Sequence, residues 1–570
     1  MELESVCNGY ETQNLRFELP FTLRGMSRRI LVAVGWPYAS GSLHLGHLGG
    51  AYLPADIFAR YHRIAGNDVL MVSGSDAHGT PITVKADEEG ISPRQVVERY
   101  HPEILGYWDS LGISFDLFTT TMTENHAKVT QDVFLRLLEK GYMVKRTTTQ
   151  YYDPEAERFL PDRYVEGTCP HCGYTQARGD QCENCGRTLD AIDLIDPRSR
   201  LTGATPVLRE TEHFFFKLPE FAEPLREWLE SKSNWRRHVR NWALAMIAEG
   251  MPERAITRDI EWGVEVPVDD LGEGKRIYVW FDAVIGYLSA AKEWAATSGD
   301  PDAWKRWWED PEAESYYFVG KDNIPFHAVM WPAMLMGYGG LNLPTDVPAN
   351  QFITFKGMKA SRSQGVGLPI SWYAERLEPD AIRYAIATVL PEQNDTDISD
   401  DDIIRRVNEE LVATWGNLVN RVLSMSERNF DGRVPPRGSL TAIDEALLSS
   451  VDKTLQTTAG HIEAVELRAG LRTAMDSASD VNAYLNSEEP WHVIKGDRDR
   501  AGTILWTAVQ AISGIRVALA PYLPWSTAQL GEMLGIGAVT GWERPDIPGE
   551  ARLGPITTLF DKLEPDALDD

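Results

Sequence analysis

The chain has 570 residues, 43% of them hydrophobic, and a formal net charge of −28. A balance this acidic excludes a protein that coats nucleic acid non-specifically, because such proteins carry an excess of positive charge. No apolar run approaches the roughly 20 residues of a membrane span, and residues 1–25 lack the apolar core of a secretory signal, so we expect a cytoplasmic protein.

The first part of the chain has the pattern of an α/β protein. The run at 28–35 (RRILVAVG) is apolar and ends at a glycine, which predicts a buried strand. A helix is expected from about 44 to 64, and a second strand at 68–73 (DVLMVS). Strands that alternate with helices predict a parallel sheet.

Composition and periodicity change twice further along the chain. Residues 151–210 are rich in Cys, Gly, Asp and Pro, which indicates an insertion that ordinary core packing does not hold. Further strands are expected at 277–281 (IYVWF), 316–319 (YYFV) and 351–355 (QFITF). Apolar residues at helical spacing then predict amphipathic helices at about 403–422, 440–464, 466–486 and 500–520, followed by a solvated acidic end (DKLEPDALDD).

Four of the five cysteines form one cluster, with the spacing Cys169-x2-Cys172-x9-Cys182-x2-Cys185. Two Cys-x-x-Cys knuckles can place four thiolates around one ion in the tetrahedral geometry that zinc adopts. Because the protein would fill all four positions, none stays open for a substrate, and the spacing predicts a structural zinc site. The alternative is a set of reduced or redox-active thiols.

Two histidines, His44 and His47, flank a Leu-Gly step where the first helix is expected to begin. Three residues apart, they share one face of the helix, and a helix N-terminus favours anions. Gly46 leaves room for a flat ring against the backbone. From the residues alone, three interpretations stay open: a phosphate site, a pair of packed or capping histidines, and a metal site, for which no third ligand at a matching spacing is evident.

HLGH at 44–47 resembles the HIGH signature of the class I aminoacyl-tRNA synthetases, which bind ATP on a split nucleotide-binding fold. Their second signature, KMSKS, has a counterpart in KASRS at 359–363, just after the predicted strand. Cations and hydroxyls in such a loop stabilise charge on departing pyrophosphate. Arg362 replaces a lysine of the family pattern, and Gln364 replaces an arginine and so removes a charge.

Other segments are similar to those of methionyl-tRNA synthetases, and the similarity extends over about 27–545. These segments are WPYASGSLHLGH (36–47), GSDAHGTPI (74–82), TRDIEWGVEVP (257–267), YVWFDAVIGY (278–287) and VGKDNIPFHAVMWPAML (319–335). The resemblance implies an α/β fold: a split Rossmann-like catalytic domain with a parallel sheet, an inserted zinc-knuckle connective domain and a C-terminal α-helical bundle.

The expected domain bounds follow from the resemblance. They are 1–26 for an N-terminal extension expected to be disordered, 27–140 and 251–345 for the two halves of the catalytic domain, 141–250 for the connective insertion with its zinc knuckle at 166–190, 346–395 for the KMSKS-type loop and linker, 396–545 for the anticodon-binding bundle, and 546–570 for an acidic tail.

The resemblance also assigns roles to individual residues. Asp76 would hold the α-ammonium of methionine, since a buried carboxylate pairs well with a cation. The rest of the methionine pocket would be Trp36, Tyr38, Trp280, Ala283, Val284, Tyr287, Asn323 and His327. The ATP site would be His44, Gly46, His47, Asp322, Lys359, Ser361 and Arg362. The catalytic groups among them would be His44, His47, Lys359 and Arg362, together with Arg258, which would contact pyrophosphate with Lys359.

The implied reaction has two steps. Methionine and ATP give methionyl-adenylate and pyrophosphate, and methionyl then passes to the terminal adenosine of methionine tRNA, initiator or elongator. Magnesium would accompany ATP, and one zinc ion would occupy the four cysteines. No appended β-barrel domain is apparent in the sequence, so we expect a monomer.

The helical domain would read the CAU anticodon through Asn417, Arg421, Pro490 and Trp491. Aromatic rings and arginine suit unstacked bases, although from the residues alone Trp491 is better explained as packing between helices. The basic run WRRHVRNW (235–242) would supply phosphate contacts or be a solvated face.

Two other functions compete with an active synthetase. One is a synthetase-like protein that binds RNA or methionine without catalysis, which only Arg362 and Gln364 support. The other is a different adenylate-forming nucleotidyltransferase, which would have no need of an anticodon-binding helical domain.

Overall fold

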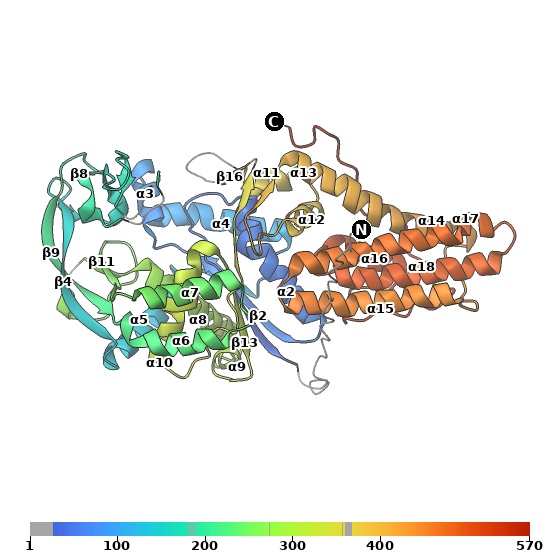
Figure 1. Cartoon of the computed structure of the whole chain (residues 1–570), viewed down its shortest axis with the longest axis horizontal. Helices are drawn as coiled ribbons and strands as arrows, with labels where there is room; N and C mark the ends of the chain where they lie inside the picture. Colours follow the sequence, from blue (N-terminus) through green and yellow to red (C-terminus); the bar gives the residue numbers. More distant parts are fainter. Residues whose placement is uncertain are drawn as a thin grey trace, which may run out of the picture.

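The computed structural model describes residues 27–569 except 180–181, 183, 186–188, 273, 356 and 360–366. The predicted N-terminal extension therefore lies outside the described residues. The molecule is elongated, with the α/β part and its connective arm towards one end and the helical part at the other (Figure 1). Its two main hydrophobic cores lie in these parts, and the first of them continues from the sheet into the helices.

A five-stranded parallel sheet forms the centre of the α/β part, in the order β14-β13-β1-β2-β3. The strands are β1 (Arg29–Val34), β2 (Asp68–Ser75), β3 (Leu117–Thr120), β13 (Glu314–Gly320) and β14 (Ala349–Asn350). Residues 30–34 are completely buried because β1 lies in the middle of the sheet, with helices packed around it. The chain leaves β1 towards β2 on one side and later returns to β13 on the other, so the fold changes direction at β1.

The strand predictions at 28–35, 68–73 and 316–319 are confirmed, but the one at 277–281 is wrong. Strand β12 (Lys275–Ile277) ends where the predicted strand begins, and Tyr278 caps helix α8 (Val279–Thr297). A short apolar run is ambiguous between a buried strand and a buried helix. Here Phe281 is apolar because α8 packs against β2 and β3 in the core.

Other helices of the α/β part cover the sheet or join its strands. They are α1 (Leu45–His47), α2 (Leu53–Ile64), α3 (Thr80–Glu89), α4 (Pro93–Leu111), α5 (Glu124–Glu139), α6 (Ala222–Ser231), α7 (Arg237–Glu249), α9 (Lys305–Trp308), α10 (Trp331–Tyr338), α11 (Ile370–Ala374) and α12 (Pro379–Thr388). A three-stranded sheet of β15 (Ile353–Phe355), β16 (Met358–Lys359) and β17 (Thr396–Ile398) precedes the helical part.

The connective insertion is more regular than its composition suggested. Strands β4 (Met143–Asp153) and β9 (Val207–Phe216) pair antiparallel along their length and form the arm in Figure 1. Strands β5 (Arg158–Phe159) and β10 (Arg254–Ala255) extend this sheet at its edges, and β11 (Thr257–Asp259) pairs with β12. Beside the arm, β6 (Val165–Thr168), β7 (Ala177–Arg178) and β8 (Ile195–Ser199) form a small sheet that carries the cysteines.

The predicted helices of the C-terminal third are confirmed. They are α13 (Asp400–Arg405), α14 (Asn417–Asn429), α15 (Ala442–Glu463), α16 (Leu467–Glu488), α17 (Pro490–Val493), α18 (Arg498–Leu519) and α19 (Pro524–Leu534). Among the described residues, α18 alone is long and apolar enough to cross a membrane by length and composition. Its apolar stretch is wholly buried among the other helices, as in the core of a bundle.

The C-terminal segment is only partly solvated. Ile547, Leu553 and Phe560 are buried, and Asn408 exchanges two hydrogen bonds of 2.8 Å with the backbone of Leu563. Apolar residues spaced along an otherwise polar segment give no helical or strand period, so the sequence did not reveal this packing. The acidic side chains of the segment still face solvent.

In the part of the chain that the structure describes, three helical stretches have wide π turns in place of α turns. They are η1 (Leu48–Tyr52), η7 (Phe326–Met330) and η9 (Arg406–Gly416). η1 directly follows His47, η7 contains His327, and η9 ends immediately before Asn417. π turns inside helices occur frequently at functional sites.

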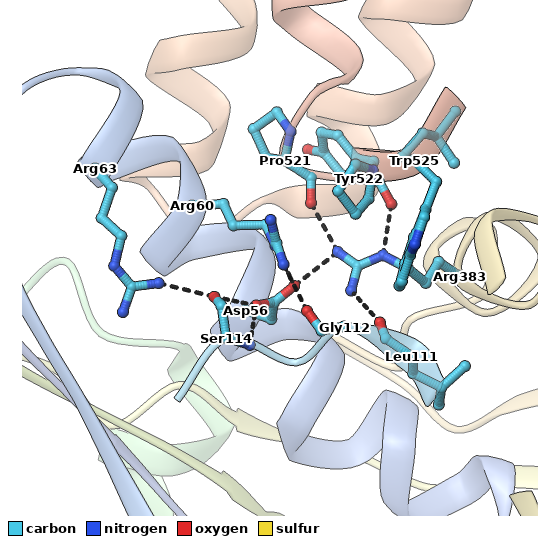
Figure 2. Close-up of polar contacts among 12 residues, drawn as sticks. Asp56, Arg60, Arg63, Leu111, Gly112, Ser114, Arg383, Pro521, Tyr522 and Trp525 are labelled. Atoms are coloured by element: carbon cyan, nitrogen blue, oxygen red, sulfur yellow. Dashed lines mark hydrogen bonds and ion pairs between the residues drawn. The ribbon is translucent and has the colours of Figure 1, made fainter. Parts of the chain in front are cut away.

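A fully buried ion pair lies at the junction between the two parts of the molecule (Figure 2). Asp56 of α2 lies 2.7 Å from Arg383 of α12. The same guanidinium donates to the carbonyls of Leu111, Pro521 and Tyr522, at 3.1, 2.8 and 2.8 Å. Arg383 thus ties the end of α4 to the turn between α18 and α19.

Candidate active site

A cavity of about 590 Å³ opens at the carboxyl ends of the central strands. The segments that directly follow β1, β2 and β13 supply Trp36, Asp76 and Asn323 to its walls. Helix α8 forms one side, and the helical run that begins at Leu45 forms another. This active-site cavity lies where a doubly wound sheet changes direction, which is where such folds bind ligands.

His44 and His47 lie against each other where this helical run begins, with ring centroids 3.8 Å apart. The N–H of Gly46 donates to His44 Nδ1 at 3.1 Å, and the N–H of His44 donates to His47 Nδ1 at 3.2 Å. Both Nδ1 atoms accept, so each neutral ring carries its proton on Nε2. The capping interpretation is therefore correct, and capping also makes each Nε2–H a donor at the positive end of a helix.

Gly46 is required by this arrangement, because a Cβ at that position would lie 2.9 Å from His44 Nδ1. The metal interpretation receives no support. Among the described residues, neither His44 nor His47 belongs to a group that could hold an ion.

Asp76 follows β2 and lines the cavity with only 2% of its surface exposed. Its Oδ1 accepts the backbone N–H of His78 at 3.1 Å. Burial raises the pKa of the Asp76 carboxyl well above its ordinary value, and the nearby Asp282 carboxyl raises it further. A cation beside Asp76 would reverse this shift, because an opposite charge favours the ionised form.

Aromatic rings form an uncharged wall of the cavity. The Tyr287 hydroxyl donates to His327 Nε2 at 2.7 Å, and His327 Nδ1 donates to the carbonyl of Asn323 at 3.0 Å. These bonds fix the tautomer of His327, and burial lowers the pKa of that ring to about 4, so it is neutral at physiological pH. Trp280 stacks on Phe326 with ring centroids 4.2 Å apart. Such a wall suits an apolar group.

Two glycines allow the Trp36 ring to sit at the cavity wall. A Cβ on Gly74 would lie 2.2 Å from the indole, and one on Gly286 would lie 2.7 Å from it. Strand β2 and helix α8 can approach the ring this closely only because neither position carries a side chain.

The structure brings most of the predicted site residues to this one cavity. Its lining includes Trp36, Tyr38, His44, Gly46, His47, Asp76, Trp280, Ala283, Val284, Tyr287, Asp322, Asn323 and His327. Arg258 lines a neighbouring cavity instead. Ser361 and Arg362 lie outside the described residues, as does the side chain of Lys359.

Sequence reasoning missed Arg163, Gln351 and Phe352, which also line the cavity. Arg163 comes from the connective insertion, and no local motif marks it. Gln351 directly follows β14, a strand of two residues that is too short to give a periodic signal.

Two family models cover almost all of the described chain. The model for class I tRNA synthetases (M) matches residues 30–423, and the model for the anticodon binding domain of methionyl tRNA ligase matches 434–554. The chain belongs to the methionyl-tRNA synthetase family. The methionine–tRNA ligase of Roseiflexus castenholzii is 53% identical to this synthetase over 518 residues, which are 90% of this chain and 87% of that protein.

Two further relatives agree with this assignment. The methionine–tRNA ligase of Dehalococcoides mccartyi strain BAV1 is 50% identical over 550 residues, 96% of the synthetase described here and 99% of the relative. The solved methionyl-tRNA synthetase of Mycobacterium tuberculosis with bound methionyl-adenylate superposes with a TM-score of 0.77 at 26% identity, and covers 94% of this chain and 100% of its own.

The four cysteines of the synthetase form a compact group that could hold a metal ion. The Sγ atoms of Cys169 and Cys185 are 3.9 Å apart, and those of Cys172 and Cys182 are 3.6 Å apart. Four sulfurs bound at ~2.3 Å to a tetrahedral ion would be separated by about 3.8 Å. These two distances between sulfurs therefore fit a tetrahedral metal site.

The residues expected to bind the anticodon lie together on the helical part. Arg421 of α14 donates to Asn482 Oδ1 at 2.6 Å, and its guanidinium lies 5.7 Å from the centre of the Trp491 ring. Asn417 is exposed one turn earlier on the same helix. Trp491, which follows the buried Pro490, is only half-buried against the bundle, so packing does not use its whole ring.

The basic run at 235–242 spans the start of α7. Arg236 donates to the carbonyls of Ala349 and Val465, at 3.0 and 3.2 Å, and Arg240 donates to that of Leu229 at 2.9 Å. Two arginines of this run therefore bind backbone carbonyls within the synthetase, whereas Arg237 remains exposed.

Proposed function

We propose that this chain activates methionine with ATP, giving methionyl-adenylate and pyrophosphate, and then transfers methionyl to the 3′-terminal adenosine of methionine tRNA, initiator and elongator. One observation carries the proposal: the capped helix start of HLGH and the buried Asp76 face the same cavity, one wall of which is aromatic and uncharged. That cavity offers one place for phosphates and another for an amino acid with an apolar side chain.

Asp76 would hold the α-ammonium of methionine, and the rings of Trp36, Tyr287 and Trp280 would surround its thioether. Contacts between sulfur and aromatic rings are worth ~0.3–1.5 kcal/mol each. The remaining pocket residues would be Tyr38, Ala283, Val284, Asn323 and His327. Because His327 is neutral and its Nε2 already accepts from Tyr287, the pocket presents no charge to the side chain.

In the first step a carboxylate oxygen of methionine attacks the α-phosphorus of ATP, and the bond from that phosphorus to pyrophosphate breaks. The Nε2–H groups of His44 and His47 would donate to phosphate oxygens as charge develops there. Gly46 and Asp322 would complete the ATP site, together with Lys359, Ser361 and Arg362 of the KASRS loop. Magnesium bound to the phosphates would offset part of their charge, and Arg258 would face the pyrophosphate.

In the second step the terminal ribose hydroxyl attacks the carbonyl carbon of the adenylate. The new ester bond forms, AMP leaves with the bridging oxygen, and the hydroxyl proton passes to the AMP phosphate. Catalysis in both steps is positioning and charge stabilisation, without a covalent intermediate on the protein.

The second step selects its RNA through the helical part, where Asn417, Arg421, Pro490 and Trp491 would bind the CAU anticodon. The exposed face of Trp491 would stack on a base. The domain bounds given above, a cytoplasmic location and a monomeric state belong to the same proposal.

The test of the whole proposal is pyrophosphate exchange into ATP, with each amino acid supplied separately. Exchange with methionine alone supports activation and the pocket assignment, and makes Arg362 a tolerated replacement. Exchange with another amino acid contradicts the pocket assignment. Folded, zinc-loaded protein without exchange would favour a non-catalytic binding protein.

Methionine affinity is expected to fall as the pH is lowered. The raised pKa of Asp76 means that the empty site takes up a proton as the pH falls through that value, and a neutral carboxyl pairs poorly with an ammonium group. Calorimetric titration of methionine from pH 8 downwards would measure this. An affinity that stays flat until the ordinary range of an aspartate, ~4, would contradict it.

Zinc removal is expected to loosen the knuckle at 166–190 before the rest of the protein, because this small sheet has few apolar residues of its own and the ion would supply its folding energy. Limited proteolysis after chelation should cut first within this segment. Cys172→Ser should lower the zinc content below one per chain, whereas Cys7→Ser, outside the cluster, should leave it unchanged.

Trp491→Ala is expected to raise the KM for tRNA by about 5- to 150-fold, corresponding to ~1–3 kcal/mol of lost stacking on a base. Methionine-dependent pyrophosphate exchange should not change, since Trp491 belongs to the helical part and does not line the active-site cavity. His492→Ala, at the exposed neighbouring position, is the matched control. An equal effect of both variants would contradict a role for the Trp491 ring.

A further inference from the structure

A second cavity, of about 370 Å³, adjoins the active-site cavity. The residues common to both walls are Tyr38, Pro81, Arg163 and Trp280. One side of the second cavity belongs to the connective insertion, through Gln150, and another to the segment that contains Ile260 and Tyr278. A molecule bound there would lie directly beside the contents of the active-site cavity.

Methionine and ATP, the reactants of the first step, are already assigned to the active-site cavity. The phosphate-binding helix start, with His44 and His47, lines only that cavity, and so do Tyr287 and His327 of the aromatic wall. The third reactant is the last nucleotide of an RNA chain, and its ribose must reach the activated carboxyl. A compartment beside Tyr38 and Trp280 meets that requirement.

The walls of the second cavity have the chemistry that binds a nucleoside. Tyr278 presents a ring to which the Arg258 guanidinium is held at 4.0 Å from the centroid, and Trp280 presents a second ring. Bases stack on such rings and on guanidinium planes. Once pyrophosphate has left Arg258 after the first step, this side chain and Arg163 give the cavity a positive charge, which suits the phosphodiester that precedes the nucleoside.

Gln150 provides a means of reading the base. It lies on β4 and lines the cavity, and among the residues that the structure describes none hydrogen-bonds to its side-chain amide. A carboxamide offers one donor and one acceptor side by side, which match the N1 and 6-amino group on the Watson–Crick edge of adenine. The volume lies near the lower end of the ~300–1,000 Å³ of small-molecule sites, so it suits one nucleoside.

We propose that this second cavity is an acceptor site that binds the 3′-terminal adenosine of tRNA, with Gln150 reading the base edge; the inference rests on the proposed function. Gln150 is then a positioning residue: it holds the nucleoside so that the ribose hydroxyl meets the adenylate carbonyl, and it touches no reacting atom. Its loss affects the second step and leaves the first unchanged.

The test measures each step separately in the full chain. Transfer is followed in a single turnover, from enzyme-bound methionyl-adenylate to a methionine tRNA that ends in adenosine or in purine riboside, which lacks the 6-amino group. Gln150→Ala should slow transfer to the adenosine end by about tenfold, the effect of one hydrogen bond. Purine riboside should slow the unaltered enzyme by a similar factor, and should slow Gln150→Ala no further.

Ile260→Trp, which fills the cavity, should reduce transfer by about a hundredfold or more, because a displaced nucleoside loses its reactive alignment. Both variants should keep methionine-dependent pyrophosphate exchange within about twofold, a change too small to reflect a lost interaction. Thr149→Ala is the matched control, since neighbouring side chains of a strand point to opposite faces, and Thr149 is exposed and does not line the cavity.

The inference is overturned if Gln150→Ala transfers at the unaltered rate, if its effect multiplies with that of purine riboside, or if Ile260→Trp still transfers normally. It is also overturned if Gln150→Ala lowers exchange as much as transfer, since the cavity would then serve activation. These results differ from failure of the proposed function, in which the unaltered protein shows no methionine-dependent exchange.

Discussion

Asp76→Asn is expected to raise the KM for methionine by roughly 30- to 5,000-fold, because truncating one partner of a buried, hydrogen-bonded charge pair costs about 2–5 kcal/mol. The side chain keeps its shape, and its oxygen can still accept the N–H of His78. Only the negative charge at the floor of the pocket is lost. Pyrophosphate exchange as a function of methionine concentration measures the effect.

The KM for ATP in the same variant should stay within a few-fold of its original value, since the phosphate-binding residues begin a different segment after β1. Asp76→Glu is a useful companion: it restores the charge but lengthens the side chain in a site with 2% exposure. A normal methionine KM in Asp76→Asn would contradict the assignment of the ammonium to Asp76.

Arg383→Met is expected to lower the free energy of unfolding by about 3–5 kcal/mol, because it breaks a buried ion pair and leaves Asp56 with Arg60, at 2.8 Å, as its remaining cation. This loss is large compared with the total free energy of unfolding of a typical domain, ~5–15 kcal/mol. It also frees the carbonyls of Leu111, Pro521 and Tyr522, which lie on both sides of the junction in Figure 2. The midpoint of urea unfolding, followed by circular dichroism, measures it.

Arg63→Met is the matched control. Arg63 lies on the same helix as Asp56 and pairs with Asp116 at 2.7 Å, but both side chains of this pair are about 30% exposed. Loss of the pair should therefore lower the free energy of unfolding by no more than ~1 kcal/mol. Equal losses from Arg383→Met and Arg63→Met would show that burial of the pair does not matter.

The strands and helices of the chain were predictable wherever a single type of element extends over the whole apolar run. The runs at 28–35 and 316–319 have that property, and so do the helices after residue 400. The run at 277–281 does not, because the chain changes there from the end of β12 to the start of α8. The C-terminal segment packs through scattered apolar residues such as Ile547 and Phe560, which no period reveals.

The residues of the candidate site that stand in recognisable motifs were predictable, and the others were not. His44, Asp76 and Asn323 follow three different strands of one parallel sheet, so strand order brings them together. Arg163 belongs to an insertion whose position over the cavity depends on the pairing of β4 with β9, a contact between segments far apart in the sequence. Likewise, neither residue of the Asp56–Arg383 pair stands in a motif.

The π turns have a consequence for how the chain length can vary. A π turn is a helical turn with one residue more than an α turn, so deleting a residue there restores a regular helix instead of breaking one. Each residue of an α-helix turns the direction of the side chains by about 100° around the helix axis. A deletion within η1 would therefore leave α2 intact while rotating His44 and His47 away from the cavity. At such places the chain can lose a residue, remain folded and stop working.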